Sequence, residues 1–254
     1  MKIFVLIVCL LAIYFPIHSQ DTSSFFQYST INALLEGYYD GDLSCKELKE
    51  HGDFGIGTFN GLDGELILYQ GVCYRSLNDG SIELVSDSVK TPFASVAYFK
   101  PSITISVSSY KAYSNLSQMI DSILKTKNTV EAIKIEGFFK NIKLRSVPRQ
   151  TKPYQKLVKI VETQPTFEYQ NIEGSLIGFR CPDYAMGINV PKYHFHFLSK
   201  NKQKGGHLLD ISVDKAQVSI QYLRKILVQI PDNILFDSLL LEHNQSAELE
   251  KVEK

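Results

Sequence analysis

The chain has 254 residues, of which 44% are hydrophobic and 21% are charged. This is the composition of an ordinary globular protein with enough apolar residues for one large domain or two small ones. Its 27 basic side chains balance its 27 acidic ones. That balance excludes the strongly basic proteins that bind nucleic acids or anionic membranes through their charge.

The N-terminus has the pattern of a secretory signal peptide. Lys2 supplies a positive charge, the chain is then apolar from Ile3 to Phe15, and Pro16 ends the apolar run before a small residue at Ser19. The run is too short to span a membrane. We therefore expect residues 1–19 to be removed, leaving a secreted or periplasmic protein with no membrane anchor.

Three cysteines remain after that cleavage, at positions 45, 73 and 181. An odd number of cysteines is not a disulfide framework, even in an exported protein. We predict no disulfide bridge, and we expect Cys181 to pack in the core.

The first half of the mature chain is predicted to contain two short helices and then antiparallel strands. Thr30 can cap the first helix, and Ser44 with Glu47 has the capping-box spacing that begins the second. Turn residues then separate short alternating segments, as in a β-meander. The predicted elements are helices at 31–36 and 45–51 and strands at 55–60, 65–69, 73–77, 81–85, 96–99 and 103–107.

One longer helix and a second series of strands follow. An apolar stripe predicts a helix over 116–126, capped by Ser114 or Asn115. The fold class is therefore mixed α/β and rich in strands, and a change of pattern near 148–155 divides residues 20–150 from residues 151–254. The remaining expected elements are strands at 132–137, 138–147, 156–161, 173–180, 192–198, 207–213, 216–222 and 225–230, an apolar helix at 233–241 and a charged tail.

Three histidines lie close together in the sequence near residue 200. Residues 193–197 alternate between aromatic and histidine side chains, so in a strand over 193–198 His194 and His196 share one face, roughly 7 Å apart. Residues 199–206 read as a hairpin loop that returns His207 beside them. Three neutral imidazoles with a fourth position open are typical of a catalytic zinc site. The alternative is a strand whose histidines face solvent or pair with carboxylates.

Two charged residues could serve such a metal. Glu65 opens a strand directly after a tight turn, which puts it at the edge of a sheet. Arg145 ends an apolar alternation and could bind a carboxylate through two hydrogen bonds. Alternatively, these are a solvated strand-end carboxylate and a surface ion pair, and the acidic tail is a frayed end.

Four separated motifs resemble the α-acetolactate decarboxylase family. They occur in the expected order, and the resemblance extends over about residues 28 to 253. The motifs are Gly52 to Glu65, Thr91 to Ala94, Arg145 to Pro148 with Lys152 to Tyr154, and His194-x-His196 with Gly205 to His207.

The resemblance implies a zinc enzyme that converts (S)-2-acetolactate to (R)-acetoin and CO2 in acetoin and butanediol biosynthesis. It also implies a homodimer with two subdomains. The N-terminal one is a mixed β-sheet with helices, extending across the dimer, and the C-terminal one is barrel-like and carries the zinc. In this reading the metal polarises the substrate's oxygens, the arginine orients the carboxylate or the enediolate, and a glutamate delivers the proton.

The family's site residues transfer to matching positions of this chain. The tail glutamate matches Glu253 best, with Glu250 as an alternative. The implied zinc ligands are His194, His196 and His207, and the other implied site residues are Glu65, Arg145, Glu253 and Thr58.

Two other functions fit a three-histidine site without the resemblance. One is a secreted zinc-binding β protein that captures a ligand without catalysis. The other is a zinc hydrolase that activates a water molecule. The sequence has no His-Glu-x-x-His helix that would indicate a metalloprotease.

Overall fold

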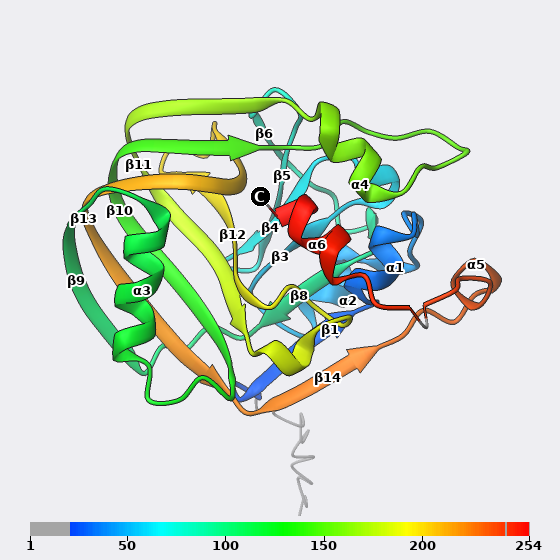
Figure 1. The fold of residues 1–254 in the computed structure, drawn as a ribbon, viewed down its shortest axis with the longest axis horizontal. Helices are drawn as coiled ribbons and strands as arrows, with labels where there is room; N and C mark the ends of the chain where they lie inside the picture. Colours follow the sequence, from blue (N-terminus) through cyan, green and yellow to red (C-terminus); the bar gives the residue numbers. More distant parts are fainter. Residues whose placement is uncertain (1–20, 242, 254) are drawn as a thin grey trace, which may run out of the picture.

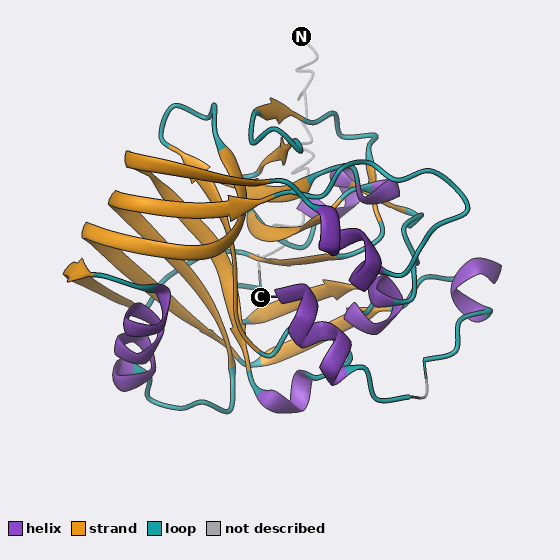
Figure 2. Ribbon diagram, turned by 45° about the horizontal axis from the view of Figure 1, so that its top comes forward, coloured by secondary structure: helices purple, strands orange, loops and turns teal. Residues whose placement is uncertain are grey.

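The structure is a computed structural model that describes residues 21–241 and 243–253. It is a mixed, strand-rich α/β fold, as predicted. Long curved strands fill one side, and helices α1, α4, α5 and α6 gather on the other (Figures 1 and 2). The predicted signal peptide lies outside the described residues. Within the described ranges, no helix combines the length and the apolar character needed to cross a membrane.

The first sheet has seven strands in the order β14-β1-β8-β3-β4-β5-β6. Only β1 and β14 pair in parallel, so the sheet is mixed, as the resemblance implied. Its strands are β1 (Ser24–Tyr28), β3 (Phe54–Thr58), β4 (Glu65–Tyr69), β5 (Val72–Ser76), β6 (Ile82–Leu84), β8 (Ala94–Ala97) and β14 (Lys225–Gln229). A separate two-stranded ladder joins β2 (Leu43–Ser44) to β7 (Lys90–Thr91).

The second sheet closes on itself as a small barrel. Strands β10, β11, β12 and β13 pair in turn, and β13 also pairs with β10, so the hydrogen-bonded ring is complete. This confirms the predicted barrel-like unit. Its strands are β9 (Ile103–Tyr110), β10 (Val130–Arg145), β11 (Thr166–Cys181), β12 (Lys192–Ser199) and β13 (Gly205–Leu223).

The boundary predicted near residue 150 does not follow the division between the sheets. Strands β9 and β10 precede it and belong to the barrel, whereas β14 follows it and pairs with β1 at the edge of the first sheet. The division into folding units at that position stays a prediction.

Helices α1 (Ile31–Leu35) and α2 (Cys45–Lys49) begin as predicted, with a side-chain cap from Thr30 and a complete capping box at Ser44. Helix α3 (Tyr113–Ile123) begins earlier than predicted, and the predicted cap from Ser114 or Asn115 is wrong. A carboxylate distant in sequence replaces it, because Asp210 Oδ1 accepts a 3.0 Å hydrogen bond from the amide of Tyr113.

Three predictions for the C-terminal half are corrected. Residues 156–161 are not a strand but helix α4 (Leu157–Ile160) followed by a 3-10 turn, because Leu157 and Ile160 bury one face at helical spacing. Over 233–241, only α5 (Ile234–Asp237) is α-helical. The tail is not frayed but forms α6 (Ser246–Glu253). Shorter 3-10 turns occupy Asn60–Leu62, Val161–Thr163 and Asp183–Ala185.

Helices α1, α4 and α6 share one apolar cluster. Leu249 and Val252 of α6 are buried there against Leu34 of α1 and Leu157 of α4. A helix as short as α6 is not stable alone in water, so it depends on these tertiary contacts. The cluster therefore brings the end of the chain to the mouth of the barrel, where the functional residues lie.

Candidate metal centre

The three histidines meet where the barrel closes. His194 and His196 lie on β12, and His196 is directly opposite His207 of β13. On its other side, His207 is opposite Arg145 at the end of β10. Gly206 has a φ of +152°, and a Cβ there would lie 2.8 Å from the carbonyl oxygen of Arg145, so the three strands can approach only with glycine at this position.

The imidazoles are arranged to hold a metal ion. One ring nitrogen from each of His194, His196 and His207 lies within 4.8 Å of the others. The Nδ1 of His196 lies 2.8 Å from the carbonyl oxygen of Leu66, so Nδ1 carries the proton and Nε2 keeps a lone pair. The Nε2 atoms of His194 and His196 are buried and have no hydrogen-bond partner among the described residues. This donor set fits a divalent ion such as zinc.

The environment keeps these histidines neutral. Burial, with a smaller contribution from the charge of Arg145, lowers the pKa of His194 to about 3. Burial also lowers the pKa of His196 and of His207 well below the usual value. Neutral imidazole is the form that binds metals, so no proton has to be removed before an ion enters.

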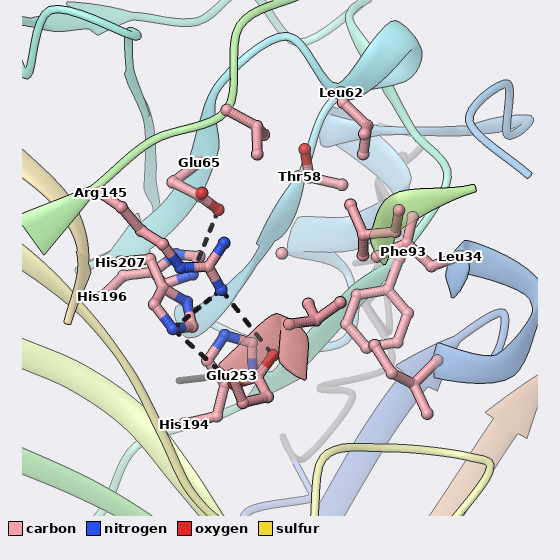
Figure 3. Close-up of a pocket in the computed structure, with 15 residues that line it drawn as sticks. Leu34, Thr58, Leu62, Glu65, Phe93, Arg145, His194, His196, His207 and Glu253 are labelled. Carbon is pink, nitrogen blue, oxygen red and sulfur yellow. Dashed lines mark hydrogen bonds and ion pairs between the residues drawn. The ribbon is translucent and has the colours of Figure 1, made fainter. Parts of the chain in front are cut away.

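Two carboxyl groups flank the histidines (Figure 3). Glu65 Oε2 lies 3.4 Å from His196 Nε2, and Glu253 Oε2 lies 3.7 Å from His207 Nε2. Burial raises the pKa of each carboxyl to about 7, against the opposing effect of the Arg145 charge. Each group can therefore gain or lose a proton near neutral pH.

Arg145 directs its guanidinium into the same space. Nη2 lies 3.2 Å from His207 Nε2 and 4.0 Å from Glu253 Oε1. On its other side, Nη1 donates a 2.8 Å hydrogen bond to Gln164 Oε1. A metal ion bound at His207 Nε2 would replace the contact between the imidazole and Nη2, which would leave that guanidinium nitrogen available to an anion.

The rest of the cavity is mainly apolar, and the empty space between its walls, including the part open to solvent, is about 450 Å³. Thr58 lies at its edge, opposite Glu65 in the β3–β4 pairing, and its hydroxyl donates a 2.8 Å hydrogen bond to the carbonyl of Gly64. Figure 3 shows the apolar wall facing the histidine cluster. Its side chains are Ile31, Leu34, Leu62, Phe93, Val147, Leu157 and Val252.

The structure brings all seven predicted site residues around this one cavity, while their individual roles stay predictions. It also separates the two candidate tail glutamates. Glu253 lines the cavity and Glu250 does not, although both line a second groove beside α6 with Ser246 and Leu249.

Sequence reasoning missed the groups that support the site. These are the Gln164 amide on Arg145, the Leu66 carbonyl on His196, and the Val147 backbone, which hydrogen-bonds Glu65. Two of the three are backbone groups, which no residue pattern marks. Gln164 could not be recognised either, because residues 156–161 were expected to be a strand, whereas Gln164 ends the 3-10 turn that follows α4.

The fold and the site define a class of β-rich proteins in which three barrel histidines can hold a metal ion at a small, buried cavity. The sequence profile described as alpha-acetolactate decarboxylase matches residues 25–243. The chain belongs to this alpha-acetolactate decarboxylase family, which confirms the resemblance carried by its motifs.

Curated relatives carry the same family name. The chain is 43% identical over 229 residues to the alpha-acetolactate decarboxylase of Methanosarcina mazei, covering 90% of this chain and 80% of the relative. It is 38% identical over 224 residues to that of Bacillus subtilis, covering 88% of each chain.

Solved structures of the family share the fold. The alpha-acetolactate decarboxylase of Bacillus subtilis strain 168 superposes with a TM-score of 0.89 at 37% identity, covering 91% of this chain and 99% of the other. A Staphylococcus aureus protein of unknown function, described as similar to alpha-acetolactate decarboxylase, gives a TM-score of 0.85 at 30% identity, with 90% and 98% covered.

Proposed function

We propose that this protein is an acetolactate decarboxylase that converts (S)-2-acetolactate to (R)-acetoin and CO2 with the help of zinc. Family membership supports the reaction. The observation that carries the proposal is the convergence, in one buried cavity, of three neutral imidazoles, one guanidinium and two carboxyls with raised pKa values.

The chemistry of the substrate explains the need for these groups. 2-Acetolactate is a β-keto acid, so when the bond to its carboxylate breaks, the electron pair moves onto the ketone oxygen and CO2 leaves. The product of this step is an enediolate, which becomes acetoin when a proton is added to carbon. Zinc bound by the three histidines would supply a Lewis acid for the negative charge that develops on the oxygen.

The side chains around the cavity bind the substrate, supply the proton and exclude water. Arg145 binds the substrate carboxylate and holds the breaking bond across the plane of the carbonyl group. Glu65 or Glu253 holds a proton in the buried site and transfers it to one face of the enediolate, which fixes the (R) configuration. The apolar wall accommodates the two methyl groups and excludes water.

The direct test is acetoin and CO2 formation from racemic acetolactate by the purified mature protein, with and without a chelator. We expect turnover to (R)-acetoin alone, lost on chelation and restored by Zn²⁺. A tightly bound ion without turnover would instead support the non-catalytic metal-binding alternative. Turnover that chelation does not reduce would remove the metal from the proposal.

Gln164 provides a test of the role given to Arg145. Replacing Gln164 by alanine removes the acceptor that holds Nη1, and we expect kcat to fall about tenfold, since one charge-assisted hydrogen bond is lost. Metal content, measured by elemental analysis, should not change. Gln170→Ala, at an exposed position of β11, is the matched control. Equal kcat values for the two variants would show that Gln164 does not position the arginine.

We propose further that the protein is a homodimer, joined through the edge of the first sheet at β14. The outer side of β14 has no strand partner among the described residues. Ile226 and Leu227 on this strand are 43% and 53% exposed, and Ile230 just beyond it is 49% exposed. An edge with several exposed apolar side chains favours pairing with a second copy.

A charge placed on that edge should separate the subunits. We expect Leu227→Arg to convert the dimer to monomer in light scattering coupled to gel filtration. Leu84→Arg is the control, because Leu84 is 72% exposed on β6 at the opposite edge of the same sheet. Dissociation by Leu84→Arg alone would move the interface to the other edge.

The predicted signal peptide leads us to propose that the enzyme is exported to the periplasm or the medium. The proposal rests on residues 1–19 of the sequence alone. Intact-mass measurement of protein from the native host should give a chain that begins near Gln20. A chain that retains residues 1–19 would contradict export by cleavage.

A further inference from the structure

One carboxylate outside the cavity joins three segments of the chain. Glu36 follows α1, and its Oε1 accepts hydrogen bonds from Lys156 Nζ at 2.8 Å and His243 Nε2 at 3.1 Å, and one from Gln245 Nε2. Lys156 immediately precedes α4, while His243 and Gln245 lead into α6. Glu36 therefore joins the end of α1 to the starts of α4 and α6.

The same three helices supply one wall of the active-site cavity. Ile31 and Leu34 come from α1, Leu157 comes from α4, and Val252 and Glu253 come from α6. Figure 1 shows α6 lying between α1, α4 and the barrel, with the end of the chain at the barrel mouth. The contacts at Glu36 thus hold the start of α6, whereas Glu253, which lines the cavity, lies at the end of the same helix.

Helix α6 depends on such contacts more than the barrel strands do. It spans only Ser246–Glu253, and only Leu249 and Val252 on it are buried. Two buried side chains let a short helix rotate or slide, whereas a polar contact at its start fixes its register. The carboxylate of Glu253 reaches the histidines in one register of the helix, in which it lies 3.7 Å from His207 Nε2.

The contact between Glu36 and Gln245 is better shielded from water than an ordinary surface ion pair, whereas the Lys156 and His243 donors are 46% and 49% exposed. The Glu36 side chain is only 14% exposed, and Gln245 is 3% exposed. By comparison, Lys159 and Glu162 on the neighbouring turn are 62% and 58% exposed. A charged acceptor shielded from water gains much more from its donors than an exposed one.

We propose that Glu36 is a positioning residue, which holds the start of α6 so that Glu253 at its end reaches the metal centre. The role in turnover rests on the proposed decarboxylase function. The role in holding α6 does not, since it concerns only the position of the helix.

Turnover tests the first role. Glu36→Ala should lower kcat by roughly ten- to a hundredfold, the loss expected for hydrogen bonds to a charged group, with KM and metal content changed much less. Glu36→Gln keeps an acceptor oxygen and should recover part of the loss. Glu173→Gln, which breaks an exposed ion pair with Lys200 outside the cavity, is the matched control and should leave kcat unchanged.

A double variant separates positioning from general stability. Because Glu36 acts through Glu253, kcat of Glu36→Ala combined with Glu253→Gln should equal that of Glu253→Gln alone. Losses that multiply in the double variant would show that Glu36 acts independently of Glu253 and would overturn the positioning role.

Hydrogen exchange tests the position of α6 without any assay of turnover. In Glu36→Ala, amides of residues 246–253 should exchange about tenfold faster or more, while amides of β10 and β13 keep their wild-type rates. Unchanged exchange in α6, or an equal increase throughout the barrel, would overturn the proposal. If the wild-type protein shows no turnover, the proposed function fails, yet this measurement still decides whether Glu36 holds the helix.

Discussion

Replacing His196 by alanine is expected to remove the bound metal and abolish turnover. In the proposed site His196 is a metal ligand, because it lies opposite His207 across the strands and its Nδ1 is already fixed by the Leu66 carbonyl. With two imidazoles left, the affinity for a divalent ion falls steeply, and the Lewis acid is lost with it. Elemental analysis should find no stoichiometric zinc in the dialysed variant.

The control for this variant is His51→Ala. His51 stacks on Phe26 beside the first sheet, with ring centroids 3.7 Å apart, and it does not line the cavity. We expect this control to keep one ion per chain. A full zinc complement in His196→Ala would refute the assignment of His196 as a ligand.

Arg145→Ala is expected to lower kcat by roughly a hundred- to a thousandfold with the metal retained. The guanidinium is buried beside the histidines, and its loss removes a fixed positive charge from the place where we propose that the substrate carboxylate binds. Arg145→Lys should recover little of this loss, because an ammonium group cannot contact both the Gln164 amide and a carboxylate in the same planar geometry.

Arg149→Ala separates this effect from a general loss of positive charge. Arg149 lies four positions further along the chain, and its side chain is 72% exposed beside Asp63. We expect its kcat to stay within about twofold of wild type, as for most exposed ion pairs. Near-normal kcat in Arg145→Ala would exclude Arg145 from the mechanism.

The arrangement of the histidines could be predicted because it depends on local geometry. Alternation along β12 puts His194 and His196 on one face, and the hairpin loop returns His207 beside them, as the structure shows. The same period of two also gave most strands of the first sheet, but not β1, because residues 20–28 read as an irregular terminus. These features depend only on the alternation of side chains along a strand and on the turn residues, and both are visible in the sequence.

Features that depend on distant contacts could not be predicted in this way. The tail becomes α6 only because Leu249 and Val252 meet a cluster built by α1 and α4. Helix α3 begins where Asp210, almost a hundred residues further on, accepts from its first amide. The residues 156–161 fit either a strand or a helix until the surface that they pack against is known.

The closure of the barrel has a consequence for its thermodynamics. Strands β12 and β13 share only three residue pairs, from His196–His207 to Leu198–Gly205, and this short seam completes the ring. An ion bound by His196 and His207 cross-links the two sides of the seam much as a covalent bridge would. Metal binding and ring closure are then linked equilibria, so the melting temperature should rise with the concentration of free zinc. In the proposed enzyme, the ion would thus also stabilise the closed form of the barrel.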